Sequence, residues 1–290
     1  MPEGHVIHRL AAELDHAFGG RTVSVSSPQG RFAEASALLD GTVFGTAEAF
    51  GKHLFLDFSP ATVPAVPGGP AEQEELALRT GPFVHIHLGL IGKLRWVRPE
   101  AVQGAGTLRL RIATEEHALE LRGPQACALV GPEEVAALVT ALGPDPLRDD
   151  ADPERGWRRV HRSERTIASL LMDQRVAAGV GNIYRAEVLY RQRIHPDTPG
   201  SALSRRAWNR IWADFVELMP QGVRHGRIDT VRPQDSPEAT GREPRVDRHG
   251  GEVYVYRRHG QPCLVCGREV SVRLFEGRNL YWCGRCQRRR

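Results

Sequence analysis

The sequence has no apolar run approaching the roughly 18 residues that a membrane-spanning helix needs. Its first ten residues, MPEGHVIHRL, carry neither the basic start nor the apolar stretch of a secretory signal. Only five of the 290 residues are cysteine, and four of those five lie near the C-terminus in spacing typical of a metal site. A disulfide framework is therefore not expected, and we expect a cytoplasmic protein without a membrane partner.

Lysine is almost absent, since Lys52 and Lys93 are the only two against 37 arginines. A lysine kept in so arginine-rich a chain hints at a need for its compact amine. Charge is also uneven: residues 1–150 carry 12 Lys+Arg and 19 Asp+Glu (12 − 19 = −7), and residues 151–290 carry 27 and 16 (27 − 16 = +11). Such a basic half is typical of a polyanion-binding protein, although a solvated basic face without a partner gives the same count.

The length predicts two or three domains. Apolar residues at near-helical spacing predict a helix over residues 5–18, which Gly19 and Gly20 end. Short alternating runs then predict β-strands within residues 21–27, 42–50, 52–58, 83–97, 107–113 and 117–122. We expect an N-terminal helix on a two-layered antiparallel β-sandwich, with a Pro/Gly/Ala-rich insertion at residues 59–75.

Helical patterns replace strands from about residue 130. They cover residues 131–143, 153–163, 166–175, 182–193 and 204–226. Residues 226–250 are polar, rich in Pro and Gly and without period, so we expect a long mobile loop of the kind that serves as a lid. Residues 251–290 return to a β pattern. The fold class is therefore α+β.

Two CxxC pairs, Cys263 with Cys266 and Cys283 with Cys286, are separated by sixteen residues. Each pair offers two thiolates at one corner of a tetrahedron, and sixteen residues suffice for two strands and a turn at residues 276–278. A redox CxxC usually occurs singly, so a chance or redox pair is the weaker interpretation. We expect one structural Zn²⁺ ion, because four thiolates leave no position for water and so small a hairpin needs the metal to fold.

A glycine-rich turn joins two of the expected helices at residues 179–182, with the sequence GVGN. Gly179 and Gly181 allow a tight turn, and Asn182 lies at the start of the next helix. Exposed N–H groups at a helix start bind phosphate well. On its own, however, this motif is weak, and a plain helix–helix corner is the favoured interpretation.

Taken together, these segments resemble the formamidopyrimidine-DNA glycosylase/endonuclease VIII family of base-excision repair enzymes. The similarity runs over the whole chain, through residues 2–4, 51–52, 87–90, 179–184 and 277–283, and the opening Pro-Glu-Gly resembles the endonuclease VIII branch. It implies a catalytic domain over residues 1–125, a helical DNA-binding domain with a helix–two-turn–helix motif over residues 126–250, and a zinc-finger hairpin over residues 251–290.

The resemblance also implies the chemistry. Once Met1 is removed, the secondary amine of Pro2 would attack C1′ of a damaged nucleotide and form a Schiff base, after which β,δ-elimination cuts the strand. Glu3 would act as general acid and base, and Lys52 would contact phosphates and support the lyase steps. On their own, the residues Met-Pro-Glu would be no more than a common chain start.

The implied DNA contacts lie in both halves of the chain. Asn182 and Arg278 would hold the phosphates beside an everted nucleotide, while Leu90 would fill the space that the base leaves. Arg122 would reach the opposite strand. The alternative for Leu90 is an ordinary hydrophobic residue at a strand end.

The sequence departs from the family pattern at three places. His5 and Val6 replace a usual Pro-Glu, which removes a second carboxylate and leaves His5 or His8 as a substitute. Pro124 stands where the formamidopyrimidine branch has an aromatic residue, and residues 226–250 lack that branch's Gly- and Thr-rich lesion-capping segment. We therefore expect oxidised pyrimidines, or simply abasic sites, in damaged DNA as the substrates. We also expect the enzyme to be a monomer associated with the nucleoid. A catalytically silent DNA-binding protein of the same fold is the alternative.

Overall fold

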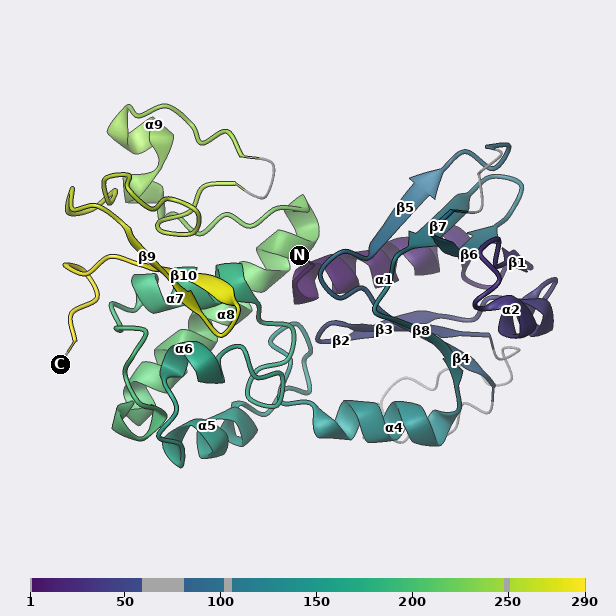
Figure 1. Ribbon diagram of the computed structural model, residues 1–290, viewed down its shortest axis with the longest axis horizontal. Coiled ribbons are helices and arrows are strands. Elements are labelled where there is room, and N and C mark those ends of the chain that lie inside the picture. The colour runs from purple at the N-terminus through teal and green to yellow at the C-terminus, as the bar shows by residue number, and fades with distance from the viewer. Residues whose placement is uncertain (1, 59–80, 102–105, 248–250, 290) are drawn as a thin grey trace. The chain divides into compact units, whose positions relative to one another are not determined.

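The computed structural model describes residues 2–58, 81–101, 106–247 and 251–289. The chain forms two compact units, Met1–Pro2 with Ile7–Ala141 and Glu3–Val6 with Leu142–Arg290 (Figure 1). Across the described ranges, no helix is both long and apolar enough to cross a membrane. The expected insertion at residues 59–75 lies outside the described residues.

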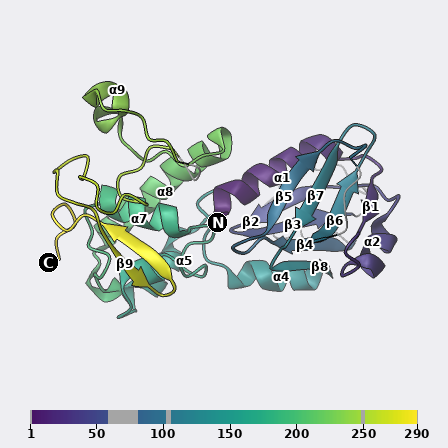
Figure 2. The same cartoon turned by 45° about the horizontal axis from the view of Figure 1, so that its top comes forward.

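The first unit contains two four-stranded antiparallel sheets. One has the strand order β1 (Ser24–Ser26), β6 (Leu108–Ala113), β7 (Ala118–Arg122), β5 (Lys93–Val97). The other has the order β2 (Ala47–Phe50), β3 (His53–Asp57), β4 (Phe83–His87), β8 (Ala126–Val130). Figure 1 shows the two sheets as separate layers, and in the turned view of Figure 2 their strands overlap.

A single hydrophobic core joins both sheets to α1 (Gly4–Phe18). Alternate residues of β6 such as Leu110 and Ile112 are buried, as the period-2 pattern of that strand requires. Leu14 and Phe18 of α1 enter the same core, because residues four positions apart lie on one helix face. The predicted helix on a two-layered antiparallel sandwich is therefore confirmed.

Two elements of this unit were not predicted. The short helix α2 (Ala33–Leu39) carries only two buried residues, so its sequence shows little amphipathic pattern. Strand β8 has only one buried residue and is held by antiparallel pairing with β4. The helix α4 (Pro132–Ala141), which was predicted, also belongs to this unit.

The second unit is built on α5 (Pro153–His161), α6 (Ile167–Leu170), α7 (Asn182–Arg191) and α8 (Arg205–His225). Local signals set the ends of α8: the Ser204 side chain accepts a hydrogen bond from the Ala207 N–H, and Gly226 ends the helix at φ 68°. Trp208, Tyr184 and Phe215 fill the core between the helices and are completely buried.

The helix predicted over residues 166–175 is shorter than expected, because α6 ends at Leu170. The Asp173 side chain accepts a hydrogen bond from the Arg175 N–H at 3.1 Å, which offers the backbone a turn in place of the helix. A short 3₁₀ turn at Gly200–Ala202 precedes α8.

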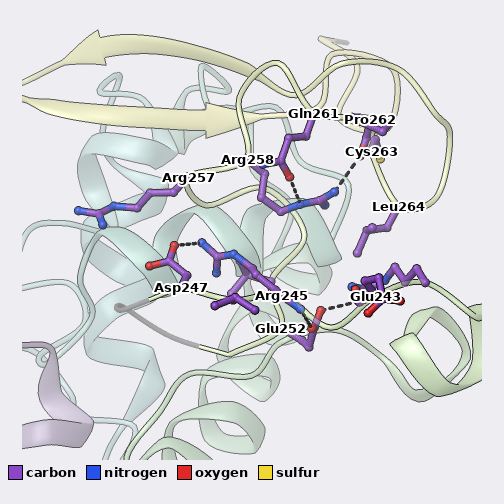
Figure 3. A pocket seen from close by; sticks show the side chains of 13 residues that line it. Glu243, Arg245, Asp247, Glu252, Arg257, Arg258, Gln261, Pro262, Cys263 and Leu264 are labelled. Carbon is purple, nitrogen blue, oxygen red and sulfur yellow. Dashed lines mark hydrogen bonds and ion pairs between the residues drawn. The ribbon is translucent and has the colours of Figure 1, made fainter.

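Residues 226–247, the described part of the predicted loop, have mostly irregular backbone, and the mobility and lid role of the loop stay predictions. A 3₁₀ turn at Pro233–Asp235 and the short helix α9 (Pro237–Thr240) lie within it. Its second half is cross-linked, since Glu252 accepts hydrogen bonds from the Arg242 guanidinium and from the Arg245 N–H at 2.6 Å (Figure 3). Paired charges distributed over irregular backbone give no periodic signal, so pattern analysis does not detect them.

The C-terminal hairpin consists of β9 (Ser271–Phe275) and β10 (Arg278–Trp282). Leu280 enters the helical core and β10 packs on α7. Arg273 forms two hydrogen bonds with the Asp197 carboxylate and lies over the Trp282 ring. The hairpin is thereby fixed to the helices of its own unit.

Candidate active site and nucleic-acid interface

The carboxylate of Glu3 lies at the N-terminus of α7 and is 1% exposed. It accepts hydrogen bonds from the N–H groups of Gly181 at 3.0 Å, Ile183 at 2.7 Å and Tyr184 at 3.4 Å. These are N–H groups that a helix start leaves without partners in its own backbone, and they favour a negative charge. The glycine-rich turn thus holds the carboxylate of Glu3 in a fixed position.

Gly181 is required here by space and not by its φ angle. Its φ of −128° suits any residue, but a Cβ atom on it would lie 2.4 Å from the Glu3 carboxyl carbon. Gly4 adds a backbone hydrogen bond from its N–H to the Gly179 carbonyl at 2.8 Å. The turn therefore fixes Glu3 and Gly4, which directly follow Pro2 in the chain.

Asn182 and Arg278, the expected phosphate contacts, come from elements that touch each other. The Asn182 amide donates to the Asn279 carbonyl at 3.0 Å, one residue from Arg278 on β10. Its oxygen accepts a hydrogen bond from Arg185, one turn further along α7. The two residues predicted to hold phosphates therefore lie in one region of the second unit.

The hairpin turn that precedes Arg278 consists of Glu276 and Gly277, both with positive φ (48° and 72°). Two consecutive residues of this kind form the tight turn that suits the twist of an antiparallel pair. Ser169 donates a hydrogen bond to the Glu276 carboxylate at 2.7 Å, which links the tip of the hairpin to α6. The predicted tip at residues 276–278 is therefore correct.

The three remaining predicted residues lie in the first unit. Lys52 occupies the tight turn between β2 and β3. Leu90 follows β4 beside Gly89, and 64% of its surface is exposed. Arg122 ends β7 and forms a 2.9 Å ion pair with Glu120, which is buried. Of these three, Leu90 is the exposed apolar residue.

Three histidines that neighbour Lys52 share one face of the β3–β4 pair. His53 Nδ1 and His85 Nε2 are 2.9 Å apart, and the ring centroids of His53 and His87 are 4.9 Å apart. Burial, followed by the repulsion of His87, lowers the pKa of both His53 and His85 to about 4. Because these pKa values lie well below neutral, the rings of His53 and His85 are uncharged near pH 7 and can pack and hydrogen-bond on this face.

The four sequence-predicted cysteines are the one cluster within the described residues with the composition and spacing of a metal site, and their sulfur atoms all lie within 4.8 Å of one another. Cys263 and Cys286 Sγ are 3.9 Å apart, and Cys266 and Cys283 Sγ 3.5 Å. Zinc–sulfur bonds of about 2.3 Å in a tetrahedron put sulfurs about 3.8 Å apart. The residues therefore fit zinc, and the Tyr190 hydroxyl lies 3.0 Å from Cys263 Sγ, as an outer hydrogen-bonding group would.

Two buried charges on α7 were not predicted. Arg185 is 1% exposed and orients Asn182 as described above. Glu187 is fully buried, and its carboxylate accepts hydrogen bonds from the Thr230 hydroxyl and from the N–H groups of Tyr254–Tyr256. Glu187 therefore joins the helix that supports Glu3 to both ends of the segment 230–256. Charged residues in a helix normally indicate its solvent-exposed face, so the sequence predicts that Arg185 and Glu187 are exposed.

A cavity of about 630 Å³ lies beside Cys263 and is lined by residues within 242–247, 252–253 and 257–264 (Figure 3). Its arginines are engaged: Arg245 pairs with Asp247, and Arg258 donates to the Tyr254 carbonyl at 2.6 Å. The lining is therefore an internal ion-pair network that stiffens this part of the chain.

Three family models together match most of the chain. They are the formamidopyrimidine-DNA glycosylase N-terminal domain over residues 1–128, the H2TH domain of the same enzymes over residues 142–233, and the zinc finger found in FPG and IleRS over residues 260–289.

Similar proteins match along their full lengths. Endonuclease 8 1 of Mycobacterium tuberculosis (strain H37Rv) is 44% identical over 99% of this chain and 100% of its own. A formamidopyrimidine-DNA glycosylase of Rippkaea orientalis is 27% identical over 99% and 100%. The fold matches that of Lactococcus lactis Fpg, solved in complex with a DNA containing N7-benzyl-Fapy-dG, with a TM-score of 0.76 at 21% identity over 99% of this chain and 100% of that one. The chain belongs to the formamidopyrimidine-DNA glycosylase/endonuclease 8 family of DNA glycosylases with abasic-site lyase activity.

Proposed function

We propose that this protein removes oxidised bases, chiefly pyrimidines, from DNA and then cuts the strand through a Schiff base on Pro2. The observation that carries the proposal is the position of the Glu3 carboxylate, which accepts hydrogen bonds from three N–H groups at the α7 N-terminus. An anionic group next to a secondary amine can take the amine's proton and return it to the sugar.

The reaction then proceeds as follows. The Pro2 nitrogen attacks C1′ with its lone pair, and the N-glycosyl bond breaks, its electron pair leaving with the base. The C1′–O4′ bond opens, O4′ takes the proton that the amine gave up to Glu3, and an iminium remains between Pro2 and C1′. Removal of a C2′ proton expels the 3′ phosphate, and a second elimination expels the 5′ phosphate.

The phosphates would be held by Asn182 and Arg278, with Lys52 stabilising charge on the leaving phosphates. Contact between Asn182 and β10 supports a joint role for the first two. One zinc ion on the four thiolates of Cys263, Cys266, Cys283 and Cys286 would hold the hairpin and take no part in the chemistry, since it has no open coordination position.

Leu90 would enter the stack where the damaged base leaves it, and its exposure supports that role. Arg122 would contact the opposite strand. The protein would act as a monomer associated with the nucleoid. The absence of an aromatic residue at position 124 favours pyrimidine lesions over 8-oxoguanine paired with cytosine.

Borohydride trapping on an abasic-site duplex tests the mechanism. We expect a covalent adduct with protein that has lost Met1. We expect no adduct with Pro2→Ala protein, which has a primary N-terminal amine in place of the secondary amine of proline. An undiminished adduct from Pro2→Ala would refute the proline mechanism. Tight binding of damaged duplex without any adduct would favour the catalytically silent alternative.

Base release tests the substrate class. We expect faster excision from a duplex containing an oxidised pyrimidine than from one containing 8-oxoguanine opposite cytosine, measured in single turnover with the same flanking sequence. The opposite order would contradict the proposed selectivity while leaving the mechanism intact.

A further inference from the structure

The helix α5 carries a row of arginines on the side opposite its buried face. Gly156 and Val160 are buried, and Trp157 packs against the same core. At 100° per residue, Arg158 and Arg162 fall on the far side of the helix, and Arg159 falls on the flank next to them. All three are exposed. We call these three residues the α5 arginine row.

Carboxylates near the row do not neutralise it. Asp152 lies 3.8 Å from the Arg158 guanidinium, with both side chains about half exposed, so this pair contributes little. Glu164 is also exposed in the loop that follows α5. His161 stacks on Trp157 with ring centroids 5.1 Å apart and therefore belongs to the neighbouring face.

The loop at the end of α5 is connected to the tip of the zinc hairpin. Arg165 donates to the Ser169 hydroxyl at 2.7 Å, and that hydroxyl donates to Glu276 at 2.7 Å. Arg165 and Arg175 both pair with Asp173, which keeps one net positive charge on that exposed group. A chain of hydrogen bonds thus links Arg165, in the loop after α5, to Glu276 in the turn before Arg278.

We propose that the α5 arginine row binds the phosphate backbone of duplex DNA beyond the lesion site and extends the surface that Arg278 begins. This inference rests on the proposed function, since it takes the DNA to lie against the hairpin tip. Four residues of helix advance by about 6 Å, a length over which duplex DNA presents roughly three to four charges. Three arginines at this spacing match that charge density.

The salt dependence of binding measures these contacts directly. The probe is a fluorescent duplex of about 25 base pairs with a tetrahydrofuran abasic analogue at its centre, titrated at several salt concentrations. Each lost phosphate contact lowers the slope of log K against log salt by about 0.9. We expect the triple variant Arg158→Gln/Arg159→Gln/Arg162→Gln to lower it by about 2 to 3. When the salt is raised from about 50 to 200 mM, the fold loss of affinity in the variant would then be smaller than that of the parent protein by a factor of up to about 40.

The triple variant Arg206→Gln/Arg210→Gln/Arg224→Gln is the matched control. It removes the same charge from exposed positions on α8, on the side of that helix opposite its buried residues. Glutamine and arginine have similar helix propensity, so far-UV circular dichroism should be unchanged in both variants. We expect the control to retain the parent slope.

A slope change below about 0.9 in the α5 variant, or an equal change in the control, would overturn the inference. In either case the parent protein would still bind the damaged duplex, so the proposed function would stand. A parent protein that does not bind the duplex would defeat both the inference and the proposed function.

Discussion

Substituting Gly181 by alanine adds a single methyl group next to the Glu3 carboxylate and tests whether the position of that carboxylate matters. The added Cβ would lie 2.4 Å from the carboxyl carbon of Glu3 and 2.7 Å from its Oε1, and atoms cannot remain so close. The backbone itself is not strained, because φ is −128°. The carboxylate must therefore leave its position, and at least the 3.0 Å hydrogen bond from the Gly181 N–H is lost.

The magnitude follows from these contacts. A hydrogen bond to a charged group contributes about 1.5–3 kcal/mol, so we expect a stability loss of about 2–3 kcal/mol. At about 2–4 °C per kcal/mol for a unit of this size, the melting temperature should fall by roughly 4–12 °C. Because a positioned acid or base contributes about 10²–10⁴-fold to rate, single-turnover trapping on an abasic duplex should slow by at least about 100-fold.

Gly284→Ala is the control for this substitution. Its added Cβ would find no neighbour closer than the Trp282 indole nitrogen at 4.0 Å. We expect wild-type trapping and melting from that variant. If Gly181→Ala protein is folded and traps at the wild-type rate, the positioning of Glu3 by the α7 N-terminus does not matter for the chemistry, and the reasoning fails.

Three further predictions concern the frame of the site. Cys266→Ser should lower both the bound zinc, measured by elemental analysis, and the affinity for damaged duplex by at least about 10-fold, because the hairpin depends on the metal; unchanged affinity in metal-depleted protein would contradict this. Since the folded-state pKa of His53 and His85 is about 4, stability should be fully present above the unfolded pKa of about 6.5 and fall as pH drops toward 4. His85→Phe should flatten that fall in thermal melts, and an unaltered pH profile would count against it. Glu187→Gln should cost about 2–4 kcal/mol and expose the segment before Tyr254–Tyr256 to limited proteolysis, because three N–H groups lose a charged acceptor; equal resistance to protease would disprove the anchoring role.

The sequence was most informative where a pattern is local. Period-2 strands predicted the sandwich, Ser204 and Gly226 marked the ends of α8, and the spacing of the cysteines indicated the metal site before any contact was known. The hairpin tip was predicted for the same reason, since a turn of two residues shows in the residues themselves.

Contacts between distant segments could not be predicted in this way. Glu3 and Gly181 lie 178 positions apart, and no pattern in either segment indicates that the two residues are in contact. Arg185 and Glu187 are charged residues on a helix that proves to be buried, which inverts the usual interpretation of charge. The ion pairs of residues 242–252 likewise appear in sequence as an irregular polar stretch.

The account depends most on which nitrogen bonds to C1′. Borohydride-trapped protein, digested and sequenced by mass spectrometry, would show the atom directly. We expect the reduced sugar on the N-terminal peptide, attached to Pro2 of a chain without Met1. Attachment to Lys52, or to any residue other than Pro2, would contradict the central claim.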